Sequence, residues 1–437
     1  MYKRNFSKAL AFVIAFSFIT NISAQNFRNE DNKILENKQS YYEELNSFAR
    51  TQKVYNTHSH MNVRIDPGDF TLDVLLKSSY VDWMGISHEK NSESIDYYIS
   101  KVKHNSYYFW LEKSLQELYD IDEKISSKNW DDISTKLVES RKQNLDEKFL
   151  YDYCKYEKII LDNFKKPGVP VSDLDVFTSA FRVNSFFYGY SAFAKDHNGN
   201  SAIVLYNNGK EINNIDEYVN FMGNEIIKQK EKGAVAIKCA LAYDRGLDFT
   251  TVEKEKAEIA LSKGNSKLSD EEIKDFQDYL FFKLCEIAAG LDMPLQVHTG
   301  LAKLQKSNAM QLREAIELNH KTKFVLFHGS YPWLDDIFGL THNYSNVYPD
   351  MCWLPLISTS AAERFLHEII EVGIIDKVAW GGDSFTVEES YGALLAMRHV
   401  LAKVLSEKVE DGYLSMDEAK EIVKKVLYSN AKGLYSN

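Results

Sequence analysis

Two histidines, His58 and His60, lie one residue apart at the end of the apolar run VYNTHSHMN. On a β-strand, residues i and i+2 face the same side, so both imidazoles point to one face of the strand. Neutral imidazole is a preferred ligand of Zn²⁺ and of similar divalent ions. The pair therefore indicates a metal site at the end of an early strand.

Further polar residues end apolar, strand-like runs later in the chain. They are Lys238 in AVAIKCA, His298 in LQVHTG, His328 in VLFHGS and Asp383 in AWGGDS. Each has a structural alternative: the histidines could be hydrogen-bonded core residues, Lys238 could reach solvent, and Asp383 could cap a helix. Four imidazoles and one carboxylate at strand ends together form a set suited to Zn²⁺ or another divalent metal.

The runs that carry these residues alternate with amphipathic segments of helical spacing, such as DEEIKDFQDYLFFKLCEIAAGL. Apolar strands separated by helices are typical of a parallel sheet buried under helices. Eight such units favour an α/β fold of the (β/α)8 TIM barrel type. An open doubly wound sheet is the alternative, but it would usually bring a Gly-rich phosphate turn that the sequence lacks. The predicted strands are 53–58, 176–183, 201–207, 233–241, 294–300, 323–330, 346–353 and 377–384.

The barrel is predicted over residues 46–437, with a helical insertion at 65–165 after the first strand. The insertion is expected because apolar residues recur there at helical spacing between charged residues. A polar stretch at 25–45 is expected to be a linker. Residues 1–24 combine a basic start, the apolar run ALAFVIAFSFI and a small residue before Gln25, which is the layout of a cleavable signal peptide.

An uncleaved anchor is the alternative to the signal peptide. Cleavage would give an exported protein, periplasmic or secreted, without a membrane segment. The net charge of −11 becomes −14 after loss of residues 1–24, because three cations and no acid are removed. This charge argues against nucleic acid or an anionic membrane as partner. A small-molecule substrate is expected, and the sequence is compatible with a homo-oligomer.

The four cysteines are widely spaced and form no CxxC pair. Cys239 lies inside an apolar strand-like run, where a buried free thiol is as plausible as a disulfide. In an oxidising compartment one or two disulfides could form.

The arrangement of HxH on a first strand, Lys on a middle strand, His on each of the next two and Asp on the last resembles the amidohydrolase superfamily. It is closer to the amidohydrolase-related branch, with uronate isomerase-like proteins and domains fused to glutamine synthetase-type proteins. The segments AIKCALAYDRGLDF, MPLQVHTG, FVLFHGSYPW and VLYSNAKGLY are similar to parts of that branch. The resemblance covers roughly residues 50–62 and 176–437.

The resemblance implies a role for each residue at the strand ends. His58, His60 and Asp383 would bind one metal, and His298 would be a further ligand. Lys238 would correspond to the lysine that CO₂ carboxylates in binuclear members, so one or two ions per chain are expected. His328 would bind a second metal or polarise the substrate, and Asp383 would move the proton of the attacking water.

The resemblance leaves three functions open. The first is a metal-dependent hydrolase of a C–N or C–O bond in a small polar molecule. The second is a lyase or isomerase on the same scaffold, such as a uronate isomerase-like enzyme or a decarboxylase. The third is a non-catalytic exported binding protein. Arg182, Arg245 and Tyr243 are candidate substrate-binding residues, because they lie at or just past strand ends; structural ion pairs and packing are the alternatives.

Overall fold

A computed structural model describes residues 39–61, 67–170, 174–263 and 267–436. The predicted signal peptide and most of the predicted linker lie outside these residues. Residues 39–51 are helical, and Leu45 and Ala49 on this helix are buried. Within the described ranges, no helix has the length and apolar content needed to cross a membrane.

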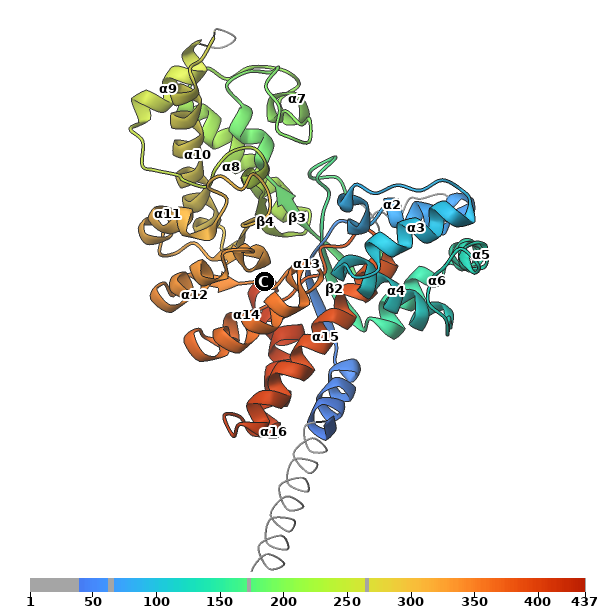
Figure 1. Ribbon diagram of the computed structural model, residues 1–437. Helices are drawn as coiled ribbons and strands as arrows, with labels where there is room; N and C mark the ends of the chain where they lie inside the picture. The colour runs from blue at the N-terminus through green and yellow to red at the C-terminus, as the bar shows by residue number, and fades with distance from the viewer. Residues whose placement is uncertain (1–38, 62–66, 171–173, 264–266, 437) are drawn as a thin grey trace, which may run out of the picture.

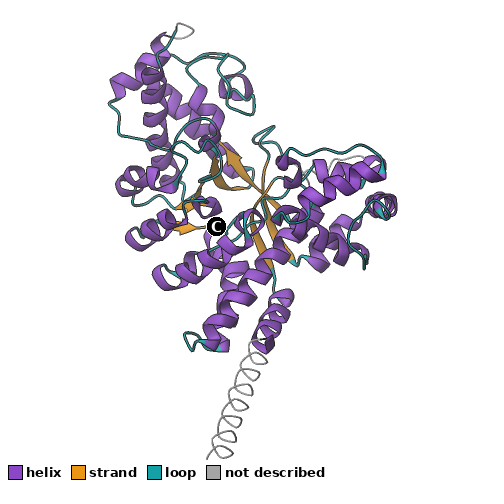
Figure 2. Ribbon diagram, viewed as in Figure 1, coloured by secondary structure: helices purple, strands orange, loops and turns teal. Residues whose placement is uncertain are grey.

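Seven parallel strands form one curled sheet in which each strand pairs with the next along the chain. The strands are β1 (Val54–Ser59), β2 (Tyr156–Asp162), β3 (Phe177–Arg182), β4 (Ala234–Cys239), β5 (Leu295–Val297), β6 (Phe324–Leu326) and β7 (Val347–Pro349). Figure 2 shows the strands in the middle of the molecule with helices around them. Since all pairs are parallel, the carboxyl ends of the strands meet at one edge of the sheet.

Residues 378–383 connect the two outer strands of this sheet. Met351 N donates to the carbonyl of Ala379 on one side, and Asp383 N donates to the carbonyl of His58 on the other. Gly381 permits this close approach, because a Cβ there would lie 2.7 Å from the backbone nitrogen of His58. The segment thus occupies the place expected for the last strand of an eight-stranded barrel. Within the described chain its one β-bridge joins Asp350 and Ala379, so it is not a regular strand.

Two sequence predictions about strands are wrong. The predicted strand 201–207 is helix α7 (Ala202–Tyr206), and the predicted insertion 65–165 contains strand β2. The run SAIVLYN is too short for periodicity to separate helix from strand. In the structure Ile203 is buried while Val204 is 54% exposed. The second strand of the sheet was missed because its apolar run, YEKIILD, directly follows a long helical pattern.

The chain between β1 and β2 is largely helical, with α2 (Leu72–Lys77), α3 (Ser92–Val102), α4 (Ser106–Tyr119), α5 (Trp130–Lys142) and α6 (Leu145–Lys148). Figure 1 shows these helices gathered on one side of the strands. α4 packs along α15 (Val387–Glu410). Glu388 of α15 is fully buried and receives Arg141 Nη2 at 2.8 Å and Tyr119 Oη at 2.6 Å. This buried pairing fixes the helical segment to the helix that follows residue 383.

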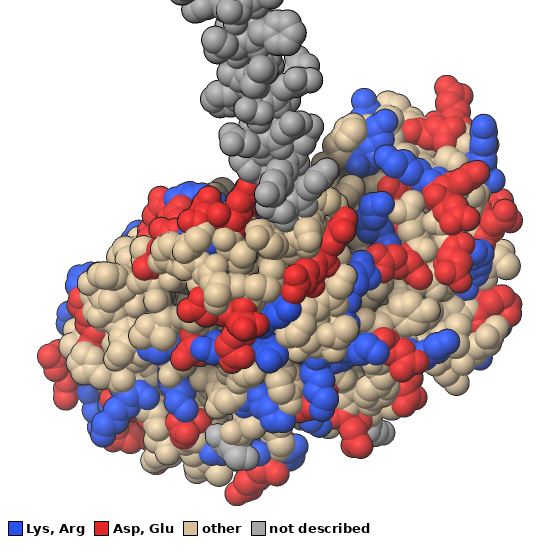
Figure 3. Space-filling model, turned by 90° about the horizontal axis from the view of Figure 1, so that it is seen from below, with Lys and Arg blue, Asp and Glu red and all other residues tan. Residues whose placement is uncertain are grey.

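The other helices cover the outside of the sheet and complete the C-terminal part. They are α8 (Ile215–Glu231), α9 (Lys254–Lys263), α10 (Asp270–Gly290), α11 (Arg313–Leu318), α12 (Leu334–Asn343), α13 (Leu354–Ile357), α14 (Thr359–Val372), α16 (Met416–Lys424) and α17 (Asn430–Tyr435). α9–α12 lie opposite α2–α6 across the strands (Figure 1). Figure 3 shows acidic and basic side chains interspersed over one face of the molecule.

Two buried clusters stabilise the fold. One contains inward-facing strand residues, among them Tyr55, Ile160 and Ala236. The other lies beneath the helices and contains alternating strand residues such as Ile159 and Leu161. This alternation places one row of side chains inside the curled sheet and the other against the helices. All four cysteines of the chain are buried free thiols.

Candidate metal site

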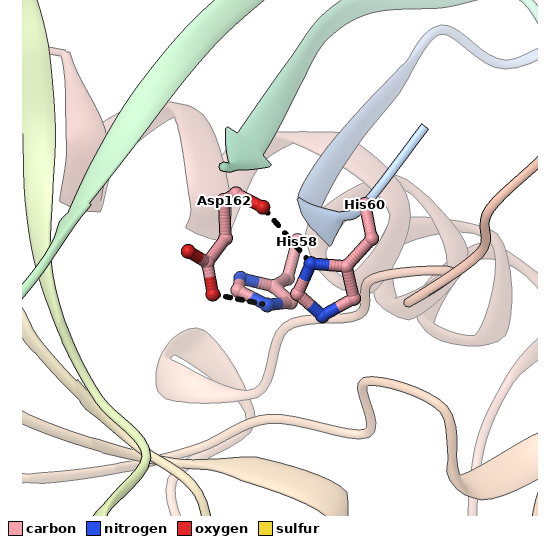
Figure 4. Close-up of side chains that lie close together, drawn as sticks. All are labelled: His58, His60 and Asp162. Carbon is pink, nitrogen blue, oxygen red and sulfur yellow. Dashed lines mark hydrogen bonds and ion pairs between the residues drawn. The ribbon is translucent and has the colours of Figure 1, made fainter. Parts of the chain in front are cut away.

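Almost every strand contributes a polar side chain at its carboxyl end. His58 lies in β1 and His60 follows it. Asp162 ends β2, Lys238 lies on β4, His298 and His328 follow β5 and β6, and Asp383 lies in the connecting segment. All are buried except His60, which is partly exposed. Figure 4 shows His58, His60 and Asp162 close together. Both His328 and Asp383 adopt positive φ angles, 67° and 54°, which are uncommon for residues other than glycine.

The first group of candidate ligands surrounds Nε2 of His58. This nitrogen lies 3.6 Å from Oδ2 of Asp162 and 3.7 Å from Oδ1 of Asp383. The same Asp383 oxygen lies 3.1 Å from Nε2 of His60. His58, His60 and Asp162 form one group that could hold a metal ion, and Asp383 joins it to a second group with His328 and Cys352.

The remaining ring nitrogens of His58 and His60 are held by oxygen acceptors. Nδ1 of His60 lies 3.0 Å from the carbonyl oxygen of Asp162. Nδ1 of His58 lies 3.2 Å from Oε1 of Gln296, whose amide nitrogen donates to the carbonyl of Thr57. An oxygen that only accepts requires a proton on the facing nitrogen. In the neutral ring the Nε2 lone pair is then free to bind a metal, which is the usual arrangement of metal-bound histidine.

His298 and His328 form a second pair. Nε2 of His298 faces the carbonyl of Leu301 at 2.8 Å, and Nδ1 of His328 faces the carbonyl of Cys352 at 2.8 Å. The other two ring nitrogens, His298 Nδ1 and His328 Nε2, lie 2.9 Å apart. If both rings are neutral and both carbonyls are satisfied, two lone pairs face each other. Two nitrogens bound to one Zn²⁺ lie roughly 2.9–3.4 Å apart, so this geometry fits a shared cation.

The charges at the site favour metal binding. Burial lowers the pKa of His58 and His298, and it lowers the pKa of His328 to about 4, so these rings are neutral near pH 7. Burial opposes ionisation of Asp383, but the neighbouring imidazoles, with His60 Nε2 3.1 Å from Oδ1, hold the pKa of Asp383 well below its usual value. Neutral imidazoles and an ionised carboxylate are the forms that bind metals.

Lys238 lies among these groups. It is 1% exposed, its ammonium lies 3.9 Å above the ring of Phe327, and it forms no ion pair with the described residues. Burial lowers its pKa to about 8, with the charges of Asp383 and Asp162 opposing the shift. With this pKa about a tenth of the amine is neutral at pH 7, far more than for an ordinary lysine, and the neutral form is the nucleophile that reacts with CO₂.

The buried polar atoms indicate that the residues fit a divalent cation. His58 Nε2 and Asp383 Oδ1 are inaccessible and make no hydrogen bond to the described residues. Unpaired buried polar atoms are costly, and a cation between them would satisfy both. Cys352 contributes a nearby sulfur, but burial raises the pKa of its thiol well above the usual value, which disfavours the thiolate that binds metals.

The three predicted substrate-binding residues have different surroundings. The guanidinium of Arg182 is buried and donates to both oxygens of Asp162, from Nε to Oδ1 and from Nη2 to Oδ2. Arg245 is paired with Asp278 at 2.6 Å. Both guanidinium groups thus have internal ion-pair partners, and a substrate-binding role for either arginine stays a prediction. Tyr243 lines a cavity beside the site, and its ring centroid lies 4.4 Å from that of His298.

Asp162 and Gln296 are site residues that sequence reasoning missed. Asp162 was assigned to the helical insertion, although it ends the apolar run KIILD in the way that His298 ends LQV. Gln296 is a fully buried amide in the middle of the strand segment PLQVHTG, which is an unusual position for glutamine. A polar residue within or directly after an apolar run was the available signal in both cases.

Known proteins share sequence and fold with this chain. The amidohydrolase family model matches residues 253–436. Over 223 residues the chain is 27% identical to protein fluG of Emericella nidulans, a match covering 47% of this chain and 26% of fluG. Over 249 residues it is 23% identical to uronate isomerase of Thermotoga maritima, covering 52% of this chain and 55% of that enzyme. The chain therefore spans about a quarter of the length of fluG and about half of the length of the uronate isomerase.

Solved structures share the fold along most of the chain. The uronate isomerase structure from Thermotoga maritima superposes with a TM-score of 0.71 at 19% identity and covers 91% of this chain and 97% of that one. The structure of a candidate metal-dependent hydrolase from Lactobacillus casei gives a TM-score of 0.63 at 19% identity. The superposition covers 90% of this chain and 97% of that one. The chain is thus similar to the amidohydrolase family over residues 253–436, and it shares the fold of these structures along most of its length.

Proposed function

We propose that the protein is a metal-dependent hydrolase that cleaves a C–N or C–O bond of a small polar molecule. The observation that carries the proposal is the pattern at the four histidines. In each ring one nitrogen faces an oxygen acceptor, and the other nitrogen points toward a neighbouring candidate ligand. Core histidines have no need for this common orientation, whereas metal ligands do.

The residues favour two cation positions. His58, His60 and Asp383 would hold one ion, with Asp162 beside them, and His298 and His328 would hold the other. Lys238, if carboxylated, would supply an oxygen ligand between them. A bound divalent cation supplies Lewis acidity, which makes a water molecule nucleophilic near neutral pH and polarises a carbonyl group.

The side chains of the protein would complete the reaction. Asp383 is ionised and can accept the proton of the attacking water, then return it to the leaving nitrogen or oxygen. The surrounding burial excludes bulk water and strengthens these electrostatic interactions. In a site with a single cation, His328 would instead polarise the substrate carbonyl.

A substrate panel with matched variants tests this proposal. Zn²⁺-loaded protein is assayed with amides, esters, lactones and sugar acids, alongside Asp383→Asn and the control Asp335→Asn, whose side chain is 76% exposed. We expect hydrolysis of at least one amide, ester or lactone, with kcat lowered by about 10²–10⁴-fold in Asp383→Asn only. Wild-type rates in Asp383→Asn, or no hydrolysis of any member of the panel, would contradict the proposal.

A uronate isomerase-like activity is the second candidate. It is favoured by the similarity to uronate isomerase of Thermotoga maritima in both sequence and fold. The same panel separates the two functions, because an isomerase would interconvert the sugar acids without hydrolysing the other compounds. Both candidates use the same metal ligands.

We also propose that the protein is exported after cleavage of residues 1–24. The support is the sequence alone, with a basic start, an apolar run and Ala24 before Gln25. N-terminal sequencing of the protein from the cell envelope or medium of an expressing bacterium should begin at Gln25. A mature protein that retains Met1 would contradict cleavage.

A further inference from the structure

A cavity of about 680 Å³ adjoins the proposed metal site. Its lining includes Trp83, Tyr107, Tyr243, Leu301, Leu304 and Trp353. These residues come from the helical chain after β1 and from the loops that follow β4, β5 and β7. The cavity is thus formed where the helical segment faces the carboxyl edge of the sheet.

Two of the lining rings contact the proposed ligands directly. The indole of Trp353 meets His328 edge-on, with centroids 5.4 Å apart and an interplanar angle of 86°. The ring of Tyr243 lies 4.4 Å from His298 and 5.2 Å from His197, and is therefore held between two imidazoles. A molecule in the cavity would consequently lie next to the second cation position.

The walls of the cavity are mostly aromatic and aliphatic, and Asn105 and Lys303 also line it. Trp353 and Tyr107 are nearly parallel, with an interplanar angle of 5°. Tyr80 stacks on Trp353 at 4.6 Å from behind the lining residues. At the rim, Trp83 is 57% exposed and Leu304 is 56% exposed. Large apolar side chains that remain exposed around one concavity are typical of a ligand site.

The polar groups of the cavity are mainly neutral donors. The hydroxyl groups of Tyr107 and Tyr243 make no hydrogen bond with any described residue. A tyrosine hydroxyl has an ordinary pKa of about 10, so both hydroxyls are protonated near neutral pH and can donate hydrogen bonds. Lys303 is the one lysine or arginine among the lining residues, and its ammonium donates to the carbonyl oxygen of Asp244.

We propose that the substrate carries a planar, unsaturated ring beside its scissile bond, and that Tyr107 and Tyr243 donate hydrogen bonds to its oxygen atoms. Flat rings stack favourably on aromatic walls, whereas a puckered, polyhydroxylated ring would leave many hydroxyl groups without partners there. The proposal rests on the proposed function, because it identifies the substrate class of the same site.

Binding of three probes to the Zn²⁺-loaded protein tests the ring preference by calorimetry. Benzamide is flat and uncharged, cyclohexanecarboxamide carries the same amide on a puckered ring, and D-glucuronate is a sugar acid. We expect benzamide to bind about three- to tenfold more tightly than cyclohexanecarboxamide, and D-glucuronate to bind most weakly. Equal affinities for the two amides, tighter binding of D-glucuronate, or no binding of benzamide at millimolar concentration would overturn the proposal.

Variants locate the binding to this cavity. Trp83→Leu and Tyr243→Phe should each weaken benzamide binding by about three- to tenfold, the first by removing a wall and the second by removing a donor. Tyr97→Phe is the matched control, because Tyr97 is 59% exposed and does not line the cavity. Unchanged affinity in both cavity variants would place the binding elsewhere and reject the proposal.

The outcomes also separate this proposal from the proposed hydrolase. Preferential benzamide binding without hydrolysis of any amide, ester or lactone would support the ring preference and reject the hydrolase. Hydrolysis of puckered substrates with no preference for flat ones would support the hydrolase and reject the ring preference.

Discussion

Oδ2 of Asp162 lies 3.6 Å from Nε2 of His58, and both oxygens of the same carboxylate accept hydrogen bonds from the guanidinium of Arg182. All three side chains are buried. The negative charge of Asp162 would therefore stabilise two positive charges, a cation bound at the proposed site and the guanidinium of Arg182. Replacing it should affect both metal binding and folding.

We expect Asp162→Asn to reduce the free energy of unfolding by about 3–5 kcal/mol, because it leaves Arg182 buried without a counter-charge. The double variant Asp162→Asn, Arg182→Met should regain much of this stability but not the metal affinity. Urea unfolding measures the first effect, and competition with a chromogenic chelator measures the second. Wild-type metal affinity in the double variant would mean that Asp162 serves only to neutralise Arg182.

The two histidine pairs should affect metal content separately. Wild-type protein should contain about two divalent ions per chain, whereas His60→Ala and His298→Ala should each retain about one. Elemental analysis after dialysis against Zn²⁺ gives these ratios. His104→Ala is a suitable control, since His104 is exposed and remote from the strand ends in sequence. A loading of one ion in the wild type, lost in His60→Ala and kept in His298→Ala, would favour a single cation position.

Lys238 should form a carbamate with CO₂. In this reaction the neutral amine attacks CO₂, a nitrogen–carbon bond forms, and the amine loses one proton. Protein equilibrated with ¹³C-bicarbonate and Zn²⁺ should show one carbamate resonance in the carbon NMR spectrum, and Lys238→Met should lack it. A spectrum without this resonance at full metal loading would remove Lys238 from the ligand set.

Glu157 should contribute a pH-dependent part of the stability away from the site. The hydrogen bond from Lys53, followed by those from Tyr428 and Lys432, lowers its pKa from 4.5 to about 2. Since the folded protein binds this proton less readily than the unfolded chain, the contribution is complete above about pH 5. It is lost as the pH falls from about 4.5 to about 2. Its size should be about 0.5–1 kcal/mol, because the side chain remains partly accessible to water.

Melting temperatures of wild type and Glu157→Gln check this expectation. The difference should be present at about pH 6 and should have largely disappeared at about pH 1.5, below the folded-state pKa. Glu123→Gln, at an exposed position, serves as the control. A difference that stays constant over this range would show that charge pairing is not its cause.

The sequence predicted much of the sheet because most of its strands are apolar runs followed by a polar residue. β4, β5 and β6 carry Lys238, His298 and His328 at or after their ends as expected. The second strand was missed because it follows helices without a break in composition. The predicted strand at 201–207 was wrong, because five to seven apolar residues fit either periodicity.

The arginines show why the substrate site was harder to predict than the metal site. Metal ligands are constrained by residue type, so a few histidines and carboxylates stand out in a sequence. An arginine in a sequence can pair equally well with a substrate carboxylate or with a carboxylate of the protein. Only the tertiary structure shows that Arg182 pairs with Asp162 and Arg245 with Asp278. The aromatic cavity depends on side chains from four separate loops, which no local pattern identifies.

The backbone bond from Asp383 to the carbonyl of His58 joins positions 325 residues apart. Consequently, during synthesis on the ribosome the first ligands emerge long before the carboxylate that completes their site. Contacts of such long range close late, because the loop entropy must be overcome first. Acquisition of metal should therefore report that the whole chain has folded, and nascent chains that end before residue 383 should not retain Zn²⁺ at this position.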